Sequence, residues 1–165
     1  MILNHKDAFS FTLRERAQTL TPPYVEEVHK LLVRDLEVAH GLRRGEVGIT
    51  GTSYRPLGIM HQLREELTRL CEQVNKAADP YSKALLALVG ISYLQPFADG
   101  NKRTARLVAN ALLIADGHAP LSYRTTDEVL YKESMLTFYE QLSLVPMKRI
   151  FTEQYLFACN QYLKI

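Results

Sequence analysis

Residues 80–117, PYSKALLALVGISYLQPFADGNKRTARLVANALLIADG, contain two apolar stretches separated by a short polar turn. The first stretch is apolar on nearly every side of a helix, which is typical of a helix at the centre of a bundle. We expect it to be helical over 80–94, with Asp79 as its N-cap and Pro96 preventing its continuation. The second stretch has apolar residues at helical spacing and predicts a helix that ends near Gly117.

The rest of the chain also favours helices. Thr21 as an N-cap and apolar residues at helical spacing predict a helix over 23–40, and leucines from Leu63 onward predict another that ends before Asp79. Two aromatic-rich helices are expected, at 126–142 and 148–163. The exception is a glycine-containing, β-leaning segment that predicts a flap or small hairpin at about 47–58. The expected fold is therefore an all-α bundle with a small β-hairpin flap, in a single domain spanning 1–165.

Composition excludes several classes of protein. With 47% hydrophobic and 23% charged residues, the chain resembles an average soluble globular protein. A net charge of +2 is too small to predict wholesale binding to nucleic acid or to an anionic membrane. No apolar stretch approaches the roughly 18 residues of a membrane span, and no signal peptide is evident. Cys71 and Cys159 fall at apolar helical positions, so we expect free core thiols in a cytoplasmic protein.

The polar turn QPFADGN has the residue types of a phosphate-binding site. Helix N-termini present unpaired backbone N–H groups and partial positive charge. Gly100 would let the backbone approach an anion closely, and Asn101 can cap the helix or donate to the ligand. Lys102, Arg103 and Arg106 follow, and the planar fork of arginine pairs well with phosphate oxygens.

Asp99 would repel a bare phosphate. Its presence is explained if Mg²⁺ lies between this carboxylate and a polyphosphate, because Mg²⁺ commonly binds one carboxylate together with waters and substrate phosphates. Phe97, between polar neighbours, is expected to point inward and anchor the turn.

A purely structural interpretation of these residues is also open. Asp99 and Asn101 can act only as helix caps, while Lys102, Arg103 and Arg106 form a solvated basic face. That interpretation is favoured for any one residue considered alone. The combination at one junction between buried helices favours a phosphate site, although neither a Walker P-loop nor a G-x-G-x-x-G loop is present.

The motif QPFADGNKRTAR closely resembles the signature of Fic (Fido) domains, His-Pro-Phe-x-[Asp/Glu]-Gly-Asn-[Gly/Lys]-Arg-x-x-Arg, and the resemblance extends from about residue 20 to 160. It implies a helical scaffold that binds ATP with Mg²⁺ and transfers AMP, or another phosphate-containing group, to a hydroxyl of a target protein. It places the motif loop and its helix at about 95–116. The roles implied are metal binding by Asp99, nucleotide binding by Gly100, Asn101, Lys102, Arg103 and Arg106, loop anchoring by Phe97, and clamping of a target segment by flap residues Gly48, Ile49, Thr50, Gly51 and Thr52.

Gln95 departs from the family pattern, because it occupies the position of the catalytic histidine. Histidine there would accept the proton of the attacking hydroxyl, whereas an amide does not bind a proton near neutral pH. Loss of a general base typically costs roughly 10²–10⁴ in rate. We therefore expect nucleotide binding to persist while the rate of group transfer falls. Either the chain keeps a nucleotide- or partner-binding role, or Gln95 was introduced to trap an inactive form of a toxin-like enzyme.

Other functions compete with transfer. A pseudoenzyme or protein-binding module would use the flap to capture a protein segment without chemistry. Nucleic-acid binding through GNKRTAR is disfavoured, because only three cations lie together there.

The family's inhibitory pattern, [Ser/Thr]-x-x-x-Glu-[Gly/Asn], is absent because no glutamate precedes Gly or Asn. Inhibition would then come from a separate antitoxin-like partner, if at all. The start of the chain, MILNHKDAFSF, resembles the helix that precedes the Fic core. The histidines are not spaced as metal ligands, and none is expected to replace the missing base: His5, His29, His40, His61 and His118.

Overall fold

In the computed structural model, which describes residues 2–162, the chain folds into seven helices, and no strand occurs in this range. Their bounds are α1 (Ile2–Arg14), α2 (Pro22–Leu32), α3 (Met60–Lys76), α4 (Pro80–Leu94), α5 (Asn101–Ala115), α6 (Glu128–Gln141) and α7 (Val145–Tyr162). The predicted all-α fold is confirmed.

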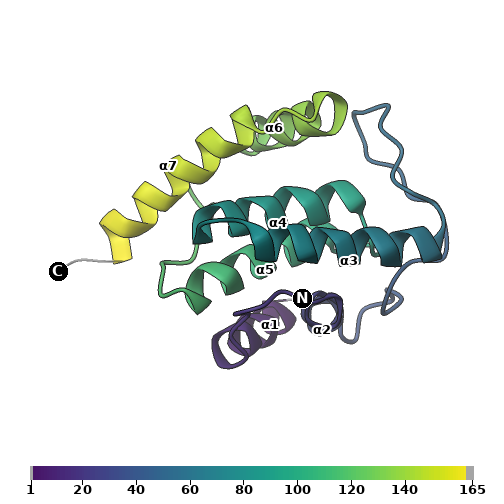
Figure 1. The fold of residues 1–165 in the computed structure, drawn as a ribbon, viewed down its shortest axis with the longest axis horizontal. Coiled ribbons are helices and arrows are strands. Elements are labelled where there is room, and N and C mark those ends of the chain that lie inside the picture. Colours follow the sequence, from purple (N-terminus) through teal and green to yellow (C-terminus); the bar gives the residue numbers. More distant parts are fainter. Residues whose placement is uncertain (1, 163–165) are drawn as a thin grey trace.

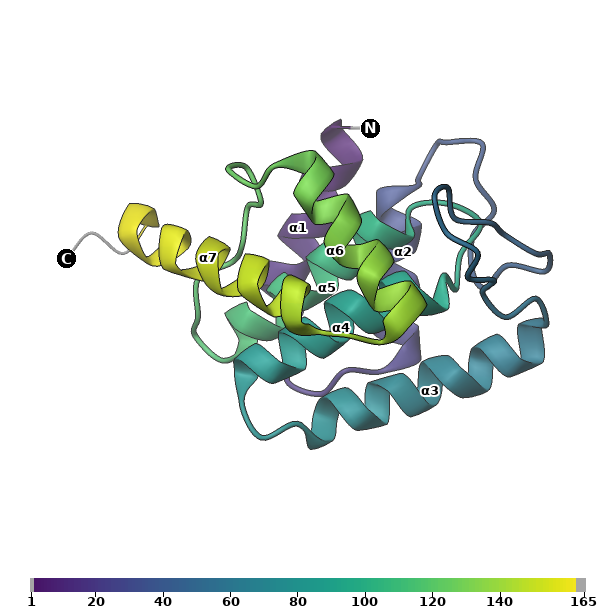
Figure 2. The ribbon, with the colours of Figure 1, turned by 90° about the horizontal axis from the view of Figure 1, so that it is seen from above.

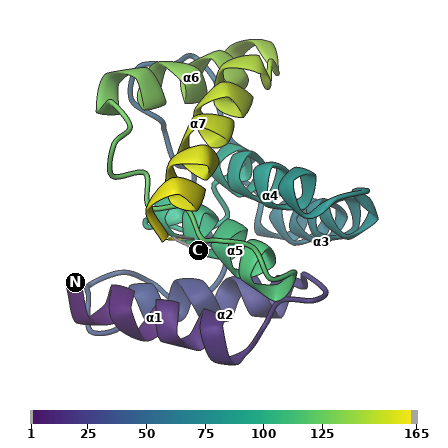
Figure 3. The same ribbon diagram turned by 90° about the vertical axis from the view of Figure 1, so that its left-hand side faces the viewer.

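The helices lie in three layers (Figures 1 and 3). The middle layer consists of α3, α4 and α5. In it, α4 packs against α5 on one side and against α3 on the other. Helices α1 and α2 pack against each other and against α5, and form one outer layer. The other outer layer is the α6–α7 pair, which crosses over α4 and α5 (Figure 2). Helix α4 and much of α5 are therefore covered by other helices, while Ala98 and Asp99 in the turn between them are exposed.

Helix α4 has the central position that its sequence predicts. Most of its residues from Ala84 onward are buried, and its N-cap is Asp79, whose carboxylate accepts a 2.9 Å hydrogen bond from the Ser82 N–H. A Cβ atom on Gly90 would lie 2.4 Å from the Leu70 side chain, so this glycine allows α3 to approach closely. The helix ends where Gln95 adopts a left-handed conformation with φ 48° and ψ 56°. That residue turns the chain into the motif loop.

The predicted helix over 23–40 is too long, because α2 ends at Leu32. Val33 is completely buried and would lie 3.4 Å from a Cβ atom on Gly100. After Val33 the chain turns, since the Leu36 N–H donates to the Val33 carbonyl at 3.0 Å and Asp35 has a φ of 58°. Packing of Val33 against the α4–α5 turn accompanies this early end.

The two C-terminal helices lie close to their predicted positions. The helix expected over 126–142 is α6, and that expected over 148–163 is α7, which begins three residues earlier at Val145. Residue 163 lies outside the described residues. The cysteines are free, as predicted; Cys71 is buried and Cys159 half-buried. Within 2–162, no helix is both long and apolar enough to cross a membrane.

The predicted β-hairpin over 47–58 is wrong, because this flap is a loop without strand pairing in the described chain. The Tyr54 N–H donates to the Thr52 hydroxyl within the flap at 3.0 Å, and other polar groups of the flap bind to the helical bundle. The Ser53 N–H donates to Glu140 of α6 at 2.9 Å, and the Tyr54 hydroxyl donates to the Tyr93 carbonyl at 3.1 Å. The flap therefore lies fixed against α4 and α6.

Candidate phosphate-binding site at the α4–α5 turn

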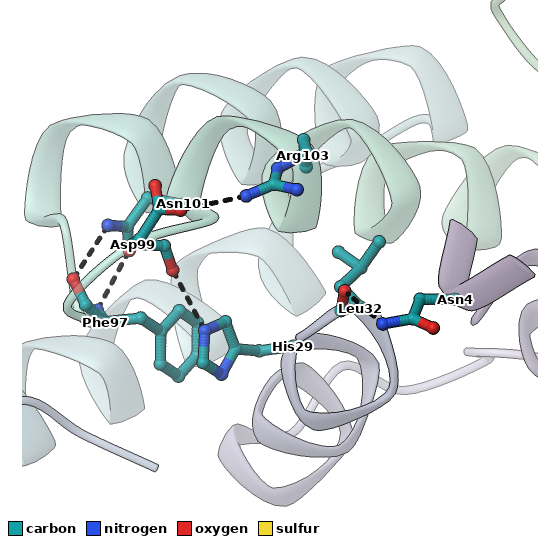
Figure 4. Close-up of polar contacts among 7 residues, drawn as sticks. All are labelled: Asn4, His29, Leu32, Phe97, Asp99, Asn101 and Arg103. Carbon is teal, nitrogen blue, oxygen red and sulfur yellow. Dashed lines mark hydrogen bonds and ion pairs between the residues drawn. The ribbon is translucent and has the colours of Figure 1, made fainter. Parts of the chain in front are cut away.

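Asn101 closes the motif loop at the first residue of α5. Its side-chain Oδ1 accepts a 2.9 Å hydrogen bond from the Phe97 N–H, and its Nδ2 donates to the Phe97 carbonyl at 2.8 Å (Figure 4). Asn101 is only 5% exposed, and Phe97 is completely buried. The Phe97 side chain therefore lies in the core, and its role as the anchor of the loop stays a prediction. The side chain of Asn101 stabilises the loop, so any contact that Asn101 makes to a ligand would come from its backbone N–H.

His29 of α2 packs against the same loop. Its ring stacks on Phe97, with ring centroids 3.8 Å apart and planes 5° apart, and its Nε2 lies 3.0 Å from the Asp99 carbonyl oxygen (Figure 4). Burial lowers the pKa of His29 to about 4. The imidazole is therefore neutral near pH 7, and Nε2 must carry its proton to donate to the carbonyl. Its Nδ1 lacks a hydrogen-bond partner.

Asp99 and Arg103 form an ion pair one helical turn apart. Arg103 Nη2 lies 3.0 Å from Asp99 Oδ2, with the Asp99 side chain 67% exposed and that of Arg103 26% exposed. Figure 4 shows the guanidinium reaching back over the start of α5. An exposed pair of this kind is weak, so Arg103 can exchange the carboxylate for a stronger anion.

Arg106 and Lys102 add positive charge beside the loop. The Arg106 guanidinium carbon lies 6.0 Å from the ring centre of Tyr123 and 5.9 Å from that of Tyr131, and Arg106 Nε donates to the Lys102 carbonyl at 3.4 Å. Burial lowers the pKa of Lys102, and the nearby charges of Lys132 and Arg106 lower it further. Cations that repel one another in this way favour binding of an anion.

The first turn of α5 supplies the backbone part of the site. Gly100 is its N-cap, with a φ of 84°, and it is buried. The Thr104 N–H donates to the Gly100 carbonyl at 2.9 Å, which begins the helical hydrogen bonds of α5. The backbone N–H groups before Thr104 lie at the helix terminus, where an anion is favoured.

Gln95 uses its amide to complete the end of α4. Its Nε2 donates to the Ser92 carbonyl at 2.6 Å, so the amide caps the helix from which it comes. The side chain is half-buried. The side chain has no group that titrates near neutral pH, so it cannot remove a proton.

Arg43 is a contributor that the sequence did not reveal. It is 4% exposed, and its guanidinium donates to the carbonyls of Gln95 (Nε, 2.6 Å), Gly45 (Nη1, 2.6 Å) and Leu57 (Nη2). Its backbone N–H donates to the Pro96 carbonyl at 3.0 Å. Arg43 thus joins both stems of the flap to the start of the motif loop. Its neighbour Arg44 is equally basic and exposed, so residue type alone did not distinguish the two.

The flap residues predicted to bind a target lie on the α6 side of the molecule. Glu140 accepts hydrogen bonds from the Thr52 hydroxyl and from Ser53. These bonds lower the pKa of Glu140, the one from Thr52 most. A Cβ atom on Gly51 would lie 3.4 Å from Leu136. Gly48 and Thr50 are exposed and Ile49 is half-buried, and the role of the five residues in binding a target stays a prediction.

Two cavities flank the motif. One of about 760 Å³ is lined by Arg103 and Arg106 together with α1 and the segment 120–123. The other, of about 440 Å³, lies between Ala98 of the loop and the segment 39–47. Neither Gly100 nor Gln95 lines the larger cavity. The two predicted arginines therefore share a cavity, but the predicted glycine lies outside it.

Two of the histidines contact other groups in the described structure. His61 is exposed on α3 and lies 3.6 Å from Glu65, while His29 is committed to the Asp99 carbonyl. No group of three or more His, Cys, Asp or Glu side chains is placed to hold a metal ion in the described part of the chain.

Comparisons with known proteins agree on one family. The model of the Fic/DOC family matches residues 19–113. The protein adenylyltransferase Fic of Nematostella vectensis is 30% identical over 128 residues, which cover 74% of this chain and 29% of that protein. The chain thus spans less than a third of the length of this relative.

Solved structures show the same fold. Fic-1 of C. elegans, residues 134–508, has a TM-score of 0.80 and 21% identity, covering 97% of this chain and 49% of that one. BepC of Bartonella tribocorum, solved with bound AMPPNP, has a TM-score of 0.69 and 18% identity, covering 91% of this chain and 83% of that one. With more than half of its residues matched by the family model and its seven helices arranged as in these structures, the chain belongs to the Fic/DOC family.

Proposed function

We propose that this chain is a nucleotide-binding Fic scaffold whose chemistry is transfer of AMP, or another phosphate-containing group, to a hydroxyl of a target protein. The observation that supports this most is the motif loop. It is fixed by Asn101 and His29, it ends at a buried helix N-terminus, and Arg103 reaches back over it. Adenylyltransferase activity in the Nematostella relative and AMPPNP in BepC agree with nucleotide as the ligand.

Phosphate binding would use two kinds of donor. The backbone N–H groups of the first turn of α5 would hold one phosphate, because they are unpaired and point along the helix axis. Arg103 would leave Asp99 for the ligand, since phosphate accepts two parallel hydrogen bonds from a guanidinium. Lys102 is placed near the same turn. These donors stabilise charge that builds up during phosphoryl or nucleotidyl transfer.

The residues of the site fit Mg²⁺ with one protein ligand. Asp99 supplies one exposed carboxylate, which suits an ion held mainly by phosphate oxygens and water. Bound there, the ion would neutralise phosphate charge. Asp99 and a ligand phosphate would hold it, and Asp99 would then be released from its pair with Arg103.

Transfer should be strongly impaired because of Gln95. The attacking hydroxyl needs a group that accepts its proton, and the Gln95 amide donates to Ser92. Left-handed backbone at residue 95 suits histidine, which is enriched in that conformation among non-glycine residues. A histidine would therefore be accepted without changing the loop.

The test compares the chain with its Gln95→His variant. We expect both to bind ATP in the presence of Mg²⁺ with similar affinity by calorimetry. We expect the variant to label a target protein with radioactive AMP about 10²–10⁴ times faster, since a general base contributes that much. His61→Gln is the matched control and should change neither. An absence of ATP binding in both forms would exclude the proposal.

A protein-binding module without chemistry is the second candidate. The tight fixing of the flap on α6 by Glu140 favours it, because a preformed surface loses little conformational entropy when it captures a segment. Gly51 has a φ of 93°, which proline cannot adopt. In this candidate Gly51→Pro abolishes partner capture, while Gln95→His leaves it unchanged. Pull-down of the target with each variant separates the two functions.

A further inference from the structure

Arg106 differs from the other cations of the motif because two aromatic rings lie beside its guanidinium. The guanidinium carbon is 6.0 Å from the ring centre of Tyr123 and 5.9 Å from that of Tyr131. Within about 6 Å, the electron-rich face of a ring attracts a cation. Arg106 pairs with no carboxylate among residues 2–162, and its hydrogen bond to the Lys102 carbonyl is long at 3.4 Å. The two rings are therefore the contacts best placed to fix the guanidinium.

The two rings come from different elements and pack against each other. Tyr123 belongs to the segment between α5 and α6, whereas Tyr131 lies on α6, which crosses over α5 (Figure 2). The ring centroids are 5.7 Å apart and the planes meet at 80°, an edge-to-face arrangement that aromatic rings favour. Tyr123 is 8% exposed, and Tyr131 and Arg106 are half-buried. Packing therefore limits the movement of both rings.

Polar side chains on either side fix the segment that carries Tyr123. Asn110 of α5 is buried; it accepts a hydrogen bond from the Leu121 N–H at 2.8 Å and donates to the Leu121 carbonyl at 2.9 Å. On the other side, Gln154 of α7 donates to the Thr125 hydroxyl at 2.9 Å. Tyr123 itself has a left-handed backbone with a φ of 55°, which is uncommon for a bulky residue. Contacts with α5 and α7 therefore determine where its ring lies.

The hydroxyl groups of Tyr123 and Tyr131 do not account for this arrangement. Both hydroxyls are buried, and neither has a hydrogen-bond partner among the described residues. Burial raises the pKa of both phenols, and the charge of Arg106 offsets only part of that rise. The phenols are therefore uncharged near pH 7 and do not form ion pairs with Arg106. The ring faces are the part of each tyrosine that acts on the guanidinium.

We propose that Tyr123 and Tyr131 are positioning residues for Arg106, whose guanidinium their rings hold in the orientation that binds phosphate. The inference rests on the proposed function in taking Arg106 as a phosphate ligand. A guanidinium that is already held loses less conformational freedom on binding, so the rings raise affinity without touching the ligand. Helix α6, which contains no residue of the motif, thereby contributes to the phosphate site.

Nuclear magnetic resonance relaxation of arginine side chains tests this positioning without any ligand. We expect the Arg106 Nε–H group to have an order parameter above about 0.7, and that of exposed Arg44 to lie below about 0.6, as in flexible groups. Tyr131→Leu removes one ring and should lower the Arg106 value toward that of Arg44. Tyr131→Phe loses only the unpartnered hydroxyl and should keep the value high. Equal mobility of Arg106 and Arg44 in the unchanged chain overturns the inference, whether or not the variants fold.

A double-mutant cycle tests whether the ring of Tyr131 acts through Arg106. In calorimetric titrations with ATP and Mg²⁺, Tyr131→Leu should weaken binding about fivefold, because the guanidinium must then be ordered on binding. Tyr131→Phe should restore the affinity. In an Arg106→Ala background, Tyr131→Leu should cause no further loss, since the group that the ring orients is absent. The same loss in both backgrounds would show that Tyr131 acts without Arg106, and would overturn the inference.

Phe138→Leu is the matched control. It removes a ring from the same helix, but that ring packs edge-to-face on Tyr93. We expect it to change neither the Arg106 order parameter nor the affinity for ATP. Effects as large as those of Tyr131→Leu would show that general packing of α6, and not the ring beside Arg106, is responsible.

The results separate this inference from the proposed function. Should ATP bind while Arg106 is as mobile as Arg44, the positioning inference is wrong and the proposed function stands. Should the unchanged chain fail to bind ATP while Tyr131→Leu still releases a rigid Arg106, the rings do hold the guanidinium and the proposed function is wrong.

Discussion

Single buried polar side chains determine the shape of the motif loop. Asn101 donates to and accepts from the backbone of one residue, Phe97, so its amide satisfies two loop groups at once. His29 contributes a third hydrogen bond, to Asp99, and stacks on the Phe97 ring. These contacts fix the backbone before any ligand binds, which lowers the entropic cost of binding.

Replacing Asn101 should destabilise the whole protein. In Asn101→Ala, the Phe97 N–H and carbonyl would remain buried without partners, and each unsatisfied group costs about 1–3 kcal/mol. We expect the free energy of unfolding in urea to fall by about 2 kcal/mol or more. Asn160→Ala, at an exposed position of α7, is the control and should change it by less than about 0.5 kcal/mol. Similar losses in both variants would show that the two hydrogen bonds contribute little.

His29 should make the protein sensitive to mild acid. Its pKa of about 4 in the folded state lies below the ordinary value of 6.5, so between these values the unfolded chain binds a proton that folded His29 does not. The free energy of unfolding therefore decreases as the pH falls from about 6.5 to about 4. The loss attributable to His29 at pH 5 is about 2 kcal/mol.

Urea unfolding at pH 7 and pH 5 measures this loss, and His29→Gln should reduce the difference between the two pH values. His61→Gln, at an exposed position on α3 and not among the groups that act on His29, should leave the difference unchanged. A protonated His29 in nuclear magnetic resonance spectra of the folded protein at pH 5.5 would contradict the expectation.

The elements of the fold are held together by contacts between segments that lie far apart in the chain. Arg43 is the main example, because its guanidinium contacts the carbonyls of three segments and its N–H contacts a neighbouring carbonyl. The position of the flap and the position of the motif loop are thereby coupled. A shift of the flap should therefore change the position of the motif loop, and the reverse.

Removal of Arg43 should release the flap. In Arg43→Ala, the carbonyls of Gly45, Leu57 and Gln95 lose their donor, so the flap opens locally more often. We expect chymotrypsin to cut the segment 45–58 about tenfold faster than in the unchanged chain. Arg44→Ala removes the same charge from an exposed side chain and should leave the rate unchanged. Equal cutting of both variants would argue against coupling by Arg43.

The helices were predictable to different degrees. The sequence specified α4 and α5 almost to the residue, because a proline, an N-capping Asp79 and a terminal Gly117 act locally. It did not predict the early end of α2, which is associated with burial of Val33 against Gly100, 67 residues later. The hairpin expected in the flap failed for a similar reason, since Glu140, 87 residues later, accepts the Ser53 backbone N–H that a strand partner would use.

The site residues were likewise predictable where their signal is local and not where it depends on distant segments. Phe97, Asp99 and the arginines lie within one motif, so their spacing revealed them. His29 and Arg43 lie 70 and 52 residues from the groups they bind, and nothing in their local sequence marks them. The roles of Asp99, Gly100, Lys102, Arg103 and Arg106 in ligand binding remain predictions.

On the scale of the whole molecule, stability is concentrated in the middle layer. Almost every residue of α5 from Thr104 to Leu113 is buried, whereas α6 buries only Ser134, Met135 and Tyr139. The α6–α7 pair touches the rest of the bundle mainly through α4. We therefore expect local unfolding to begin in the α6–α7 layer and to reach α4 and α5 last.

Amide hydrogen exchange checks this order. We expect amides in the middle of α4 and α5 to exchange only by global unfolding, and amides of α6 to exchange at least tenfold faster. Glu140→Gln should speed exchange in the flap, because it weakens the hydrogen bonds from Thr52 and Ser53. Uniform protection across all layers would contradict a hierarchy of stability.

The left-handed backbone at Gln95 also bears on how easily activity could be gained or lost in evolution. Codons for glutamine and histidine differ in a single base, and both residues can occupy this position without rebuilding the turn. A population carrying this gene would therefore lie one point mutation from a chain with a proton acceptor in place. Under the proposed function, an exchange between the two residues at this position would leave the surrounding backbone unaltered.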